Sequence, residues 1–216
     1  MAIGVLVIGR SGSGKSASLR NFKKEEFSLI NVNGKPLPFK NDFNRVINTD
    51  NAGLIQKALR KTTSKIVVID DSQYIMANEF MRNALSGREK GGKIFDTYNS
   101  IARNFWDILD CVKTMPDDTI VYFLHHEDID DYGNVKAKTQ GKAIDNHIIL
   151  EGCFTIVLRT MTNDGGYYFS TRTNGNDTVK TPMGMFKDTL IDNDLKAVDT
   201  AIRNYYGLAP VENKKA

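Results

Sequence analysis

The chain has 216 residues, of which 41% are hydrophobic, so it is long enough for one well-formed core and too short for two comfortable ones. Its two cysteines, Cys111 and Cys153, exclude a disulfide-dense secreted scaffold, and they lack the spacing of a metal site. The net charge of +3 is mild, so any binding of nucleic acid must rest on local cationic clusters.

These properties predict one domain over residues 1–209, followed by a polar tail at 210–216. No apolar run reaches the roughly 18 residues of a membrane-spanning helix. The first residues lack the basic and apolar regions of a secretory signal. We therefore expect a protein of the reducing cytosol with no membrane partner.

The first element predicted is a buried parallel strand over Ile3–Ile8. It runs into Gly9-Arg10-Ser11-Gly12-Ser13-Gly14-Lys15-Ser16, which matches the phosphate-binding P-loop. Its glycines let backbone N–H groups point inward at an anion, Lys15 reaches the outer phosphates, and the Ser16 hydroxyl holds Mg²⁺. A helix is expected to start over Ser16–Phe22 with its N-terminus facing the phosphates. The residues expected to bind the nucleotide are Gly9, Arg10, Ser11, Gly12, Ser13, Gly14, Lys15, Ser16 and Ala17.

A βαβ pattern follows the P-loop. A second strand is predicted over 27–32, a loop over 33–38, a helix over 50–60 and a fully buried strand over Ile66–Ile69. Helical spacing continues over 78–85 and 95–112, with a glycine-rich basic loop at 86–93 between these two helices.

The strand at Ile66–Ile69 ends in Asp70-Asp71, the pattern of a Walker B strand that delivers a carboxylate beside the P-loop. We expect Asp70 to hold Mg²⁺ through its water shell, because this ion keeps several waters. Asp71 is expected to orient or deprotonate the attacking water. Glu79 and Glu127 are alternatives for that role, since a glutamate usually activates the water in related folds.

A further buried strand is predicted over 119–124, followed by His125-His126-Glu127-Asp128. Polar residues at the carboxyl edge of a parallel sheet point into the ligand crevice, so one histidine is expected to sense the outermost phosphate. The only other histidine is His147, which gives no zinc-ligand spacing. The expected catalytic set is Lys15, Asp71, Glu79 and His125.

Two basic loops are the expected contacts to a phosphodiester backbone. The first lies between the two middle helices and the second, expected to be mobile, covers 133–142; solvated loops are the alternative interpretation of both. Their cations are Arg88, Lys90, Lys93, Lys136, Lys138 and Lys142. Three late cations are candidates to reach the triphosphate of a neighbouring subunit. They are Arg159, Arg172 and Lys180.

The last elements are an antiparallel hairpin and a helix. The runs at 154–159 and 167–172 flank the turn signal Asn163-Asp164-Gly165-Gly166. The final helix is predicted over Asn193–Tyr206, ending at Gly207.

The order of these elements looks like the RecA-type branch of P-loop ATPases. The chain resembles the bacteriophage-encoded short RecA-core ATPases in five segments: 70–74, 78–81, 122–125, 136–139 and 177–186. Unlike RecA proteins, it has Asn31 near the place of a glutamate that follows the P-loop helix.

That resemblance implies a RecA-like P-loop NTPase, an α/β three-layer sandwich with a mostly parallel sheet and an antiparallel C-terminal hairpin. It implies ATP and Mg²⁺ as cofactors, single-stranded DNA as partner, a ring or filament of identical subunits, and the cytoplasm of an infected bacterial host. The implied role is ATP hydrolysis during phage annealing, recombination or replication.

Two rival functions remain open. A nucleotide-gated interaction module, such as a helicase loader or packaging partner, would use ATP only to switch conformation. A small nucleotide kinase shares the length and the P-loop but usually needs an arginine-rich lid, and the region after the second strand lacks one.

Overall fold

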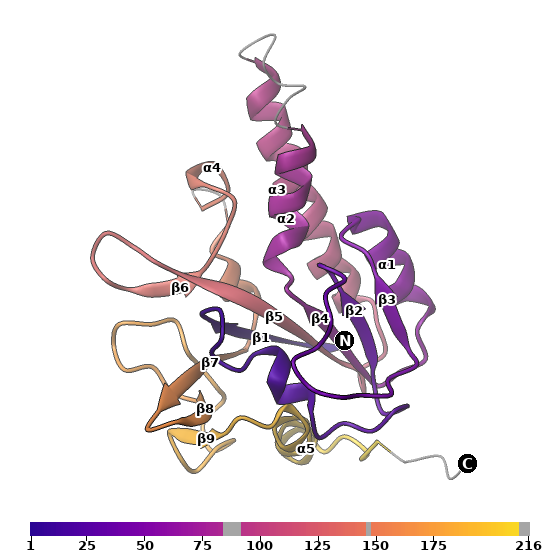
Figure 1. Ribbon diagram of the computed structural model, residues 1–216, viewed down its shortest axis with the longest axis vertical. Coiled ribbons are helices and arrows are strands. Elements are labelled where there is room, and N and C mark those ends of the chain that lie inside the picture. Colours follow the sequence, from indigo (N-terminus) through magenta and orange to yellow (C-terminus); the bar gives the residue numbers. More distant parts are fainter. Residues whose placement is uncertain (84–91, 146–147, 212–216) are drawn as a thin grey trace.

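The computed structural model describes residues 1–83, 92–145 and 148–211 (Figure 1). The strands are β1 (Ile3–Gly9), β2 (Ser28–Asn31), β3 (Val46–Asn48), β4 (Ile66–Asp70), β5 (Ile120–Ile129), β6 (Val135–Ala137), β7 (Ile156–Asn163), β8 (Gly166–Ser170) and β9 (Leu190–Asp192). The helices are α1 (Ala52–Lys61), α2 (Gln73–Asn83), α3 (Gly92–Lys113), α4 (Lys142–Asp145) and α5 (Leu195–Tyr206), with short 3-10 helices η1 (Ser16–Leu19) and η3 (Leu150–Cys153).

One sheet runs through the described residues in the order β3-β2-β4-β5-β1-β7-β8-β9, and β6 pairs with β5. The strands from β3 to β7 in this order are parallel to their neighbours. The pairs β7·β8 and β8·β9 are antiparallel. The predicted α/β class, with a mostly parallel sheet and an antiparallel C-terminal hairpin, is therefore confirmed.

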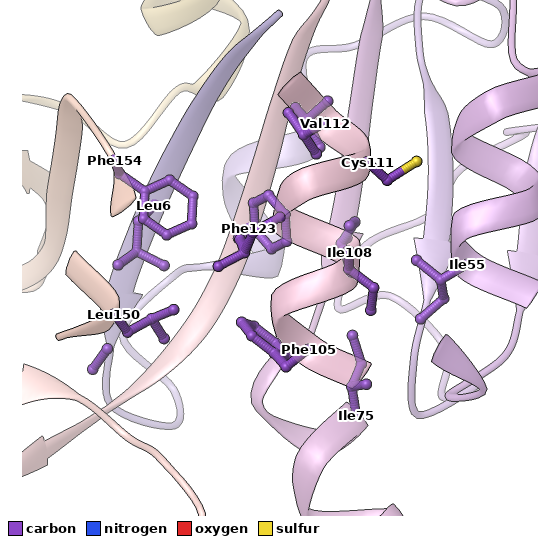
Figure 2. Close-up of a cluster of buried hydrophobic side chains, with 14 of the residues drawn as sticks. Leu6, Ile55, Ile75, Phe105, Ile108, Cys111, Val112, Phe123, Leu150 and Phe154 are labelled. Carbon is purple, nitrogen blue, oxygen red and sulfur yellow. The ribbon is translucent and has the colours of Figure 1, made fainter. Parts of the chain in front are cut away.

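The central strand β1 buries side chains on both faces of the sheet, as its continuous apolar run predicts. Leu6 and Ile8 pack with α1, α2 and α3 on one face. Val5 and Val7 pack with η1 and α5 on the other. Figure 2 shows the first face, where Phe105 of α3 lies against the sheet; its ring centroid is 6.4 Å from that of Phe123 in β5.

The final helix ends at Tyr206 as predicted and begins at Leu195, two residues after the predicted start. Asp194 caps its N-terminus, accepting hydrogen bonds from Lys196 N and Ala197 N. Gly207 adopts the left-handed conformation at φ 66° and ψ 27°, which ends the helix.

The helix expected over Ser16–Phe22 is wrong. Only the 3-10 turn η1 forms, and the Ser18 hydroxyl donates to the Lys15 carbonyl at 2.6 Å. Phe22 and Phe27 then enter one cluster with ring centroids 4.8 Å apart. Because the chain must turn between these two rings, it cannot continue as a helix.

The mobile loop expected over 133–142 is also wrong in part, because β5 continues to Ile129 and β6 pairs with it. Val135 and Ala137 of β6 are buried, which draws this segment onto the sheet. Asp130 closes the turn by accepting hydrogen bonds from Tyr132 N and Asn134 N at 2.9 and 2.8 Å. The polar residues 125–128 therefore lie within a strand and not in a loop after it.

Candidate functional site

The P-loop leaves the carboxyl end of β1 between its two parallel neighbours, β5 and β7. Gly12 and Gly14 have φ values of 77° and 100°, whereas Lys15 is right-handed with φ −50°. Alternation of this kind turns successive backbone N–H groups towards one side, which suits an anion. At Gly9 an added Cβ would overlap the Thr160 hydroxyl of β7, so close packing requires glycine there.

Lys15 lies folded against its own loop. Its ammonium Nζ donates to the carbonyls of Gly9 and Arg10, both at 2.8 Å, and the residue is 5% exposed. Burial lowers the pKa of Lys15 to about 8, against the opposing charges of Asp71 and Asp70. The ammonium is therefore protonated at neutral pH, and one of its three N–H groups is left for an anion.

Ser16 and Asp70 meet beside the loop although 54 residues separate them in the chain. Ser16 Oγ donates to Asp70 Oδ1 at 2.9 Å. Burial, and secondarily the charge of Asp71, raise the pKa of Asp70 to about 6. A hydroxyl and a carboxylate are oxygen ligands of the kind that Mg²⁺ prefers.

These two oxygens fit a magnesium site that is completed from outside the protein. No group of three His, Cys, Asp or Glu side chains suited to a metal occurs in the parts of the chain that the structure describes. Mg²⁺ held by one or two protein oxygens takes its other ligands from water and substrate phosphates. The donor set of Ser16 and Asp70 therefore suits a metal that arrives with a nucleotide.

Asp71 is surrounded by donors. Lys35 Nζ lies 2.5 Å from its Oδ2, Asn33 donates to the same oxygen at 3.0 Å, and His126 Nε2 lies 3.4 Å from Oδ1. Burial favours the neutral form, but the hydrogen bonds from His126, Lys35 and Asn33 outweigh it and hold the pKa of Asp71 well below its usual range. Asp71 is thus an ionised carboxylate with φ 59°, a conformation that non-glycine residues rarely adopt.

The structure places His126, and not the expected His125, beside this carboxylate. His125 is completely buried between the Ser72 hydroxyl (Nδ1, 2.8 Å) and the Lys138 carbonyl (Nε2, 2.7 Å). Burial lowers the pKa of His125 to about 4, which keeps it neutral. Adjacent strand residues point to opposite faces, so recognising that β5 continues past Leu124 would have separated the two histidines.

The two glutamate alternatives lie in different places. The side chain of Glu127 is buried and accepts hydrogen bonds from Arg159 at 2.8 and 3.0 Å and from Arg10 of the P-loop at 3.1 Å. Glu79 lies in α2 and accepts a hydrogen bond from Asn104 of α3 at 2.7 Å. Of the two, Glu127 is the one that contacts the P-loop.

The three late cations differ in how they are engaged. Arg159 contacts Glu127 and also lies 3.7 Å from Asp177, both within the same chain. Arg172 donates to the carbonyls of Phe186 and Lys187 at 3.2 and 3.3 Å. Lys180 is exposed, and its backbone pairs with that of Val157 in an isolated antiparallel bridge.

The side chains of only two of the expected DNA-binding cations are described, those of Lys136 and Lys138. Lys136 is ion-paired with Asp145 at 2.6 Å, and Lys138 lies 3.7 Å from Asp128. Lys142 lies in α4 and Lys93 in α3, and the structure describes only the backbone of both. Two further predicted cations fall outside the described residues: Arg88 and Lys90.

One side of the P-loop rests on C-terminal residues that the sequence analysis did not single out. Asn193 and Tyr167 both approach Gly14, where an added Cβ would lie 3.0 Å from the tyrosine ring. Arg20 Nη1 donates to the Asn193 carbonyl at 2.5 Å. Asn193 is buried and its amide Nδ2 has no hydrogen-bond partner, whereas Tyr167 is half exposed. Nothing in the local sequence around Asn193 signals this proximity.

Comparison of the chain with models of known protein families gives no match, and comparison with curated proteins gives none either. Within the described ranges, no helix combines the length and apolar character needed to cross a membrane.

Proposed function

We propose that the chain is a Mg²⁺-dependent P-loop ATPase of the RecA-like type. The observation that carries this proposal is the hydrogen bond from Ser16 of the P-loop to Asp70 at the end of β4. It joins the two motifs that must cooperate on one metal–nucleotide complex, and Lys15 lies in the same loop. Hydroxyl, carboxylate and ammonium together form the donor set that a metal triphosphate requires.

Each residue has a distinct task in this proposal. Backbone N–H groups of the loop and the Lys15 ammonium bind and orient the phosphates. Ser16 and Asp70 hold the metal, which when bound offsets phosphate charge. Asp71, kept ionised by Lys35 and His126, orients the attacking water. His126 is placed to exchange a proton with Asp71.

We extend the proposal to single-stranded DNA as the partner and to an assembly of identical subunits. The resemblance to short phage RecA-core ATPases supports both, with a role in annealing, recombination or replication. Among the described lysines of the 133–142 segment, Lys138 is the more exposed, at 46% of its side chain. Of the two exposed late cations, Arg172 donates side-chain hydrogen bonds to carbonyls of its own chain, so Lys180 is the one we assign to a neighbouring subunit.

A nucleotide-gated switch is the second candidate, and a specific observation favours it. Both acidic side chains that lie near the loop and could activate water are already engaged: Asp71 by Lys35, and Glu127 by Arg10 and Arg159. A carboxylate held by cations is a weak base, so hydrolysis by the isolated chain would be slow.

The deciding experiment measures ATP binding and hydrolysis with and without single-stranded DNA, with nucleoside monophosphates as phosphoryl acceptors in a control. Lys15→Ala should weaken ATP binding about a hundredfold, since a charge-assisted contact contributes up to about 3 kcal/mol. Lys187→Ala, at an exposed position, is the matched control.

The outcomes separate the three functions. DNA-stimulated hydrolysis supports the ATPase, and tight binding without turnover supports the switch. Phosphoryl transfer to a monophosphate would identify a kinase instead. Equal ATP affinity in the wild type and Lys15→Ala would contradict any use of the P-loop.

A further inference from the structure

A groove of about 650 Å³ lies between α1 and the strands β2 and β3, away from the P-loop. We call it the edge groove. Its floor is apolar and includes Ile30 of β2, Ile47 of β3, Leu54 of α1 and Val67 of β4. Ile47 is 47% exposed and Leu54 is 53% exposed, so adjoining apolar side chains face solvent. Neighbouring exposed apolar residues are typical of an interaction surface.

The path of the chain explains why this face is open. Parallel neighbours such as β2 and β3 are usually joined by a crossover helix that covers the sheet. Here no helix forms between them, and the connection packs Leu37, Phe39 and Phe43 against the opposite face. The face carrying Ile30 and Ile47 is therefore left to α1 alone.

The rim of the edge groove is cationic. Arg45, Lys57 and Lys61 line it, and none of the lining residues is acidic. One lining residue, Asn44, donates a hydrogen bond to a carboxylate outside the lining, that of Glu25, at 3.2 Å. An apolar floor with three cations around it complements a ligand that carries both carboxylates and apolar side chains.

The edge groove also lies along a free strand edge. β3 is the last strand of the sheet on this side and pairs only with β2 among the described strands. An exposed strand edge offers unpaired N–H and C=O groups to an extended peptide. The lining contains no aromatic ring on which a base could stack, which disfavours single-stranded nucleic acid as the occupant.

We propose that the edge groove binds an acidic, extended segment of another protein. The segment adds as a strand to β3, an apolar side chain lies on Ile47 and Leu54, and its carboxylates pair with Lys57 and Lys61. This site is separate from the nucleotide site and goes beyond the proposed ATPase function.

The test uses the full chain and a fluorescein-labelled octapeptide in which aspartate alternates with leucine and phenylalanine, monitored by fluorescence anisotropy. Saturable binding is expected, and the double substitution Lys57→Glu with Lys61→Glu should weaken it at least tenfold. Leu54→Asp should weaken it similarly. Lys187→Glu, a charge reversal outside the edge groove, should leave it unchanged, and urea unfolding verifies that each variant is folded.

Two further probes sharpen the result. A peptide with lysine replacing aspartate should not bind. Two N-methylated peptides carry the methyl groups on the two complementary sets of alternate amides, and the one whose set faces β3 should bind more weakly because it loses hydrogen bonds to that strand. The proposal is overturned by absence of saturable binding, by equal binding to the double variant Lys57→Glu with Lys61→Glu, or by unchanged affinity of both N-methylated peptides. It is also overturned if a thymidine oligonucleotide displaces the labelled peptide more effectively than the unlabelled peptide does.

Discussion

Arg159 of β7 binds Glu127 of β5 through two N–H groups, at 2.8 and 3.0 Å, across the end of β1, which separates their strands. Glu127 is 2% exposed in its side chain and Arg159 is 13% exposed. The pair therefore links β5 to β7 near the carboxyl end of β1, where the P-loop begins. Arg10 of the loop also contacts Glu127. Arg159 thus has a partner within its own chain that competes with any role at a neighbouring subunit.

The first prediction concerns that pair. Arg159→Ala should lower the free energy of unfolding by about 3 kcal/mol, because it leaves a buried carboxylate with Arg10 as its remaining cation. Urea unfolding at neutral pH measures the loss. Adding Glu127→Gln should recover most of it by removing the charge. If the single variant keeps wild-type stability, the pair is not a structural support and Arg159 regains its candidacy as a trans-acting cation.

The second prediction concerns Asp70, whose pKa is raised to about 6 in the fold. A carboxyl with a raised pKa costs stability as pH rises from its unfolded value through the folded one. Asp70→Asn should therefore raise the free energy of unfolding at pH 7 by about 2 kcal/mol, while ATP still binds and Mg²⁺-dependent hydrolysis falls. Calorimetric binding, turnover assays and urea unfolding provide the three measurements. Full hydrolysis in this variant would show that an acid other than Asp70 holds the metal.

The third prediction concerns acid sensitivity. Burial lowers the pKa of His125 to about 4, below its ordinary value of 6.5. As pH falls through 6.5, His125 is protonated in the unfolded chain but stays neutral in the folded protein, so the free energy of unfolding decreases until about pH 4. Between pH 7 and pH 5 this loss amounts to about 2 kcal/mol.

His125→Asn should remove that contribution, and comparison of urea midpoints at the two pH values tests it. The difference between variant and wild type isolates His125 from Asp70, whose titration acts in the opposite direction. Parallel pH profiles for the two proteins would show that His125 is not the group responsible.

The fourth prediction concerns single-stranded DNA. Replacing Lys136, Lys138 and Lys142 by alanine should weaken binding and flatten its salt dependence, each lost contact lowering the log–log slope by about 0.7. Because Lys136 is ion-paired with Asp145, its own contribution should be smaller than that of Lys138. Titrations at several salt concentrations measure the slope, and ATP affinity is the control. A slope equal to that of the wild type would exclude this segment as the DNA contact.

Features with strong local chemistry were predictable from the sequence. Two continuously apolar runs, Ile3–Ile8 and Ile66–Ile69, predict buried parallel strands, and both form. The P-loop glycines demand positive φ, and the structure has it at Gly12 and Gly14. These signals indicate where the proposed phosphate-binding loop and the proposed metal-binding acid lie in the chain.

Features that depend on tertiary register were not predictable in the same way. β3 and β9 have three residues each, too few to show a period, and β3 is exposed throughout. The donors around Asp71 come from two separate segments, Asn33 and Lys35 after β2 and His126 in β5, and no sequence spacing links the two segments. The pairing of Arg159 with Glu127 likewise follows from the order of strands and not from either local sequence.

The support of the P-loop by late residues has a consequence for biosynthesis. The loop at residues 9–16 leaves the ribosome early, whereas Thr160, which contacts Ser13, and Asn193, which binds Arg20, are translated near the end. Until those residues emerge, the loop lacks the neighbours that fix its conformation. The proposed nucleotide site is therefore complete only in a chain that is almost fully synthesised, so under the proposed function nucleotide does not guide the folding of the N-terminal half during translation.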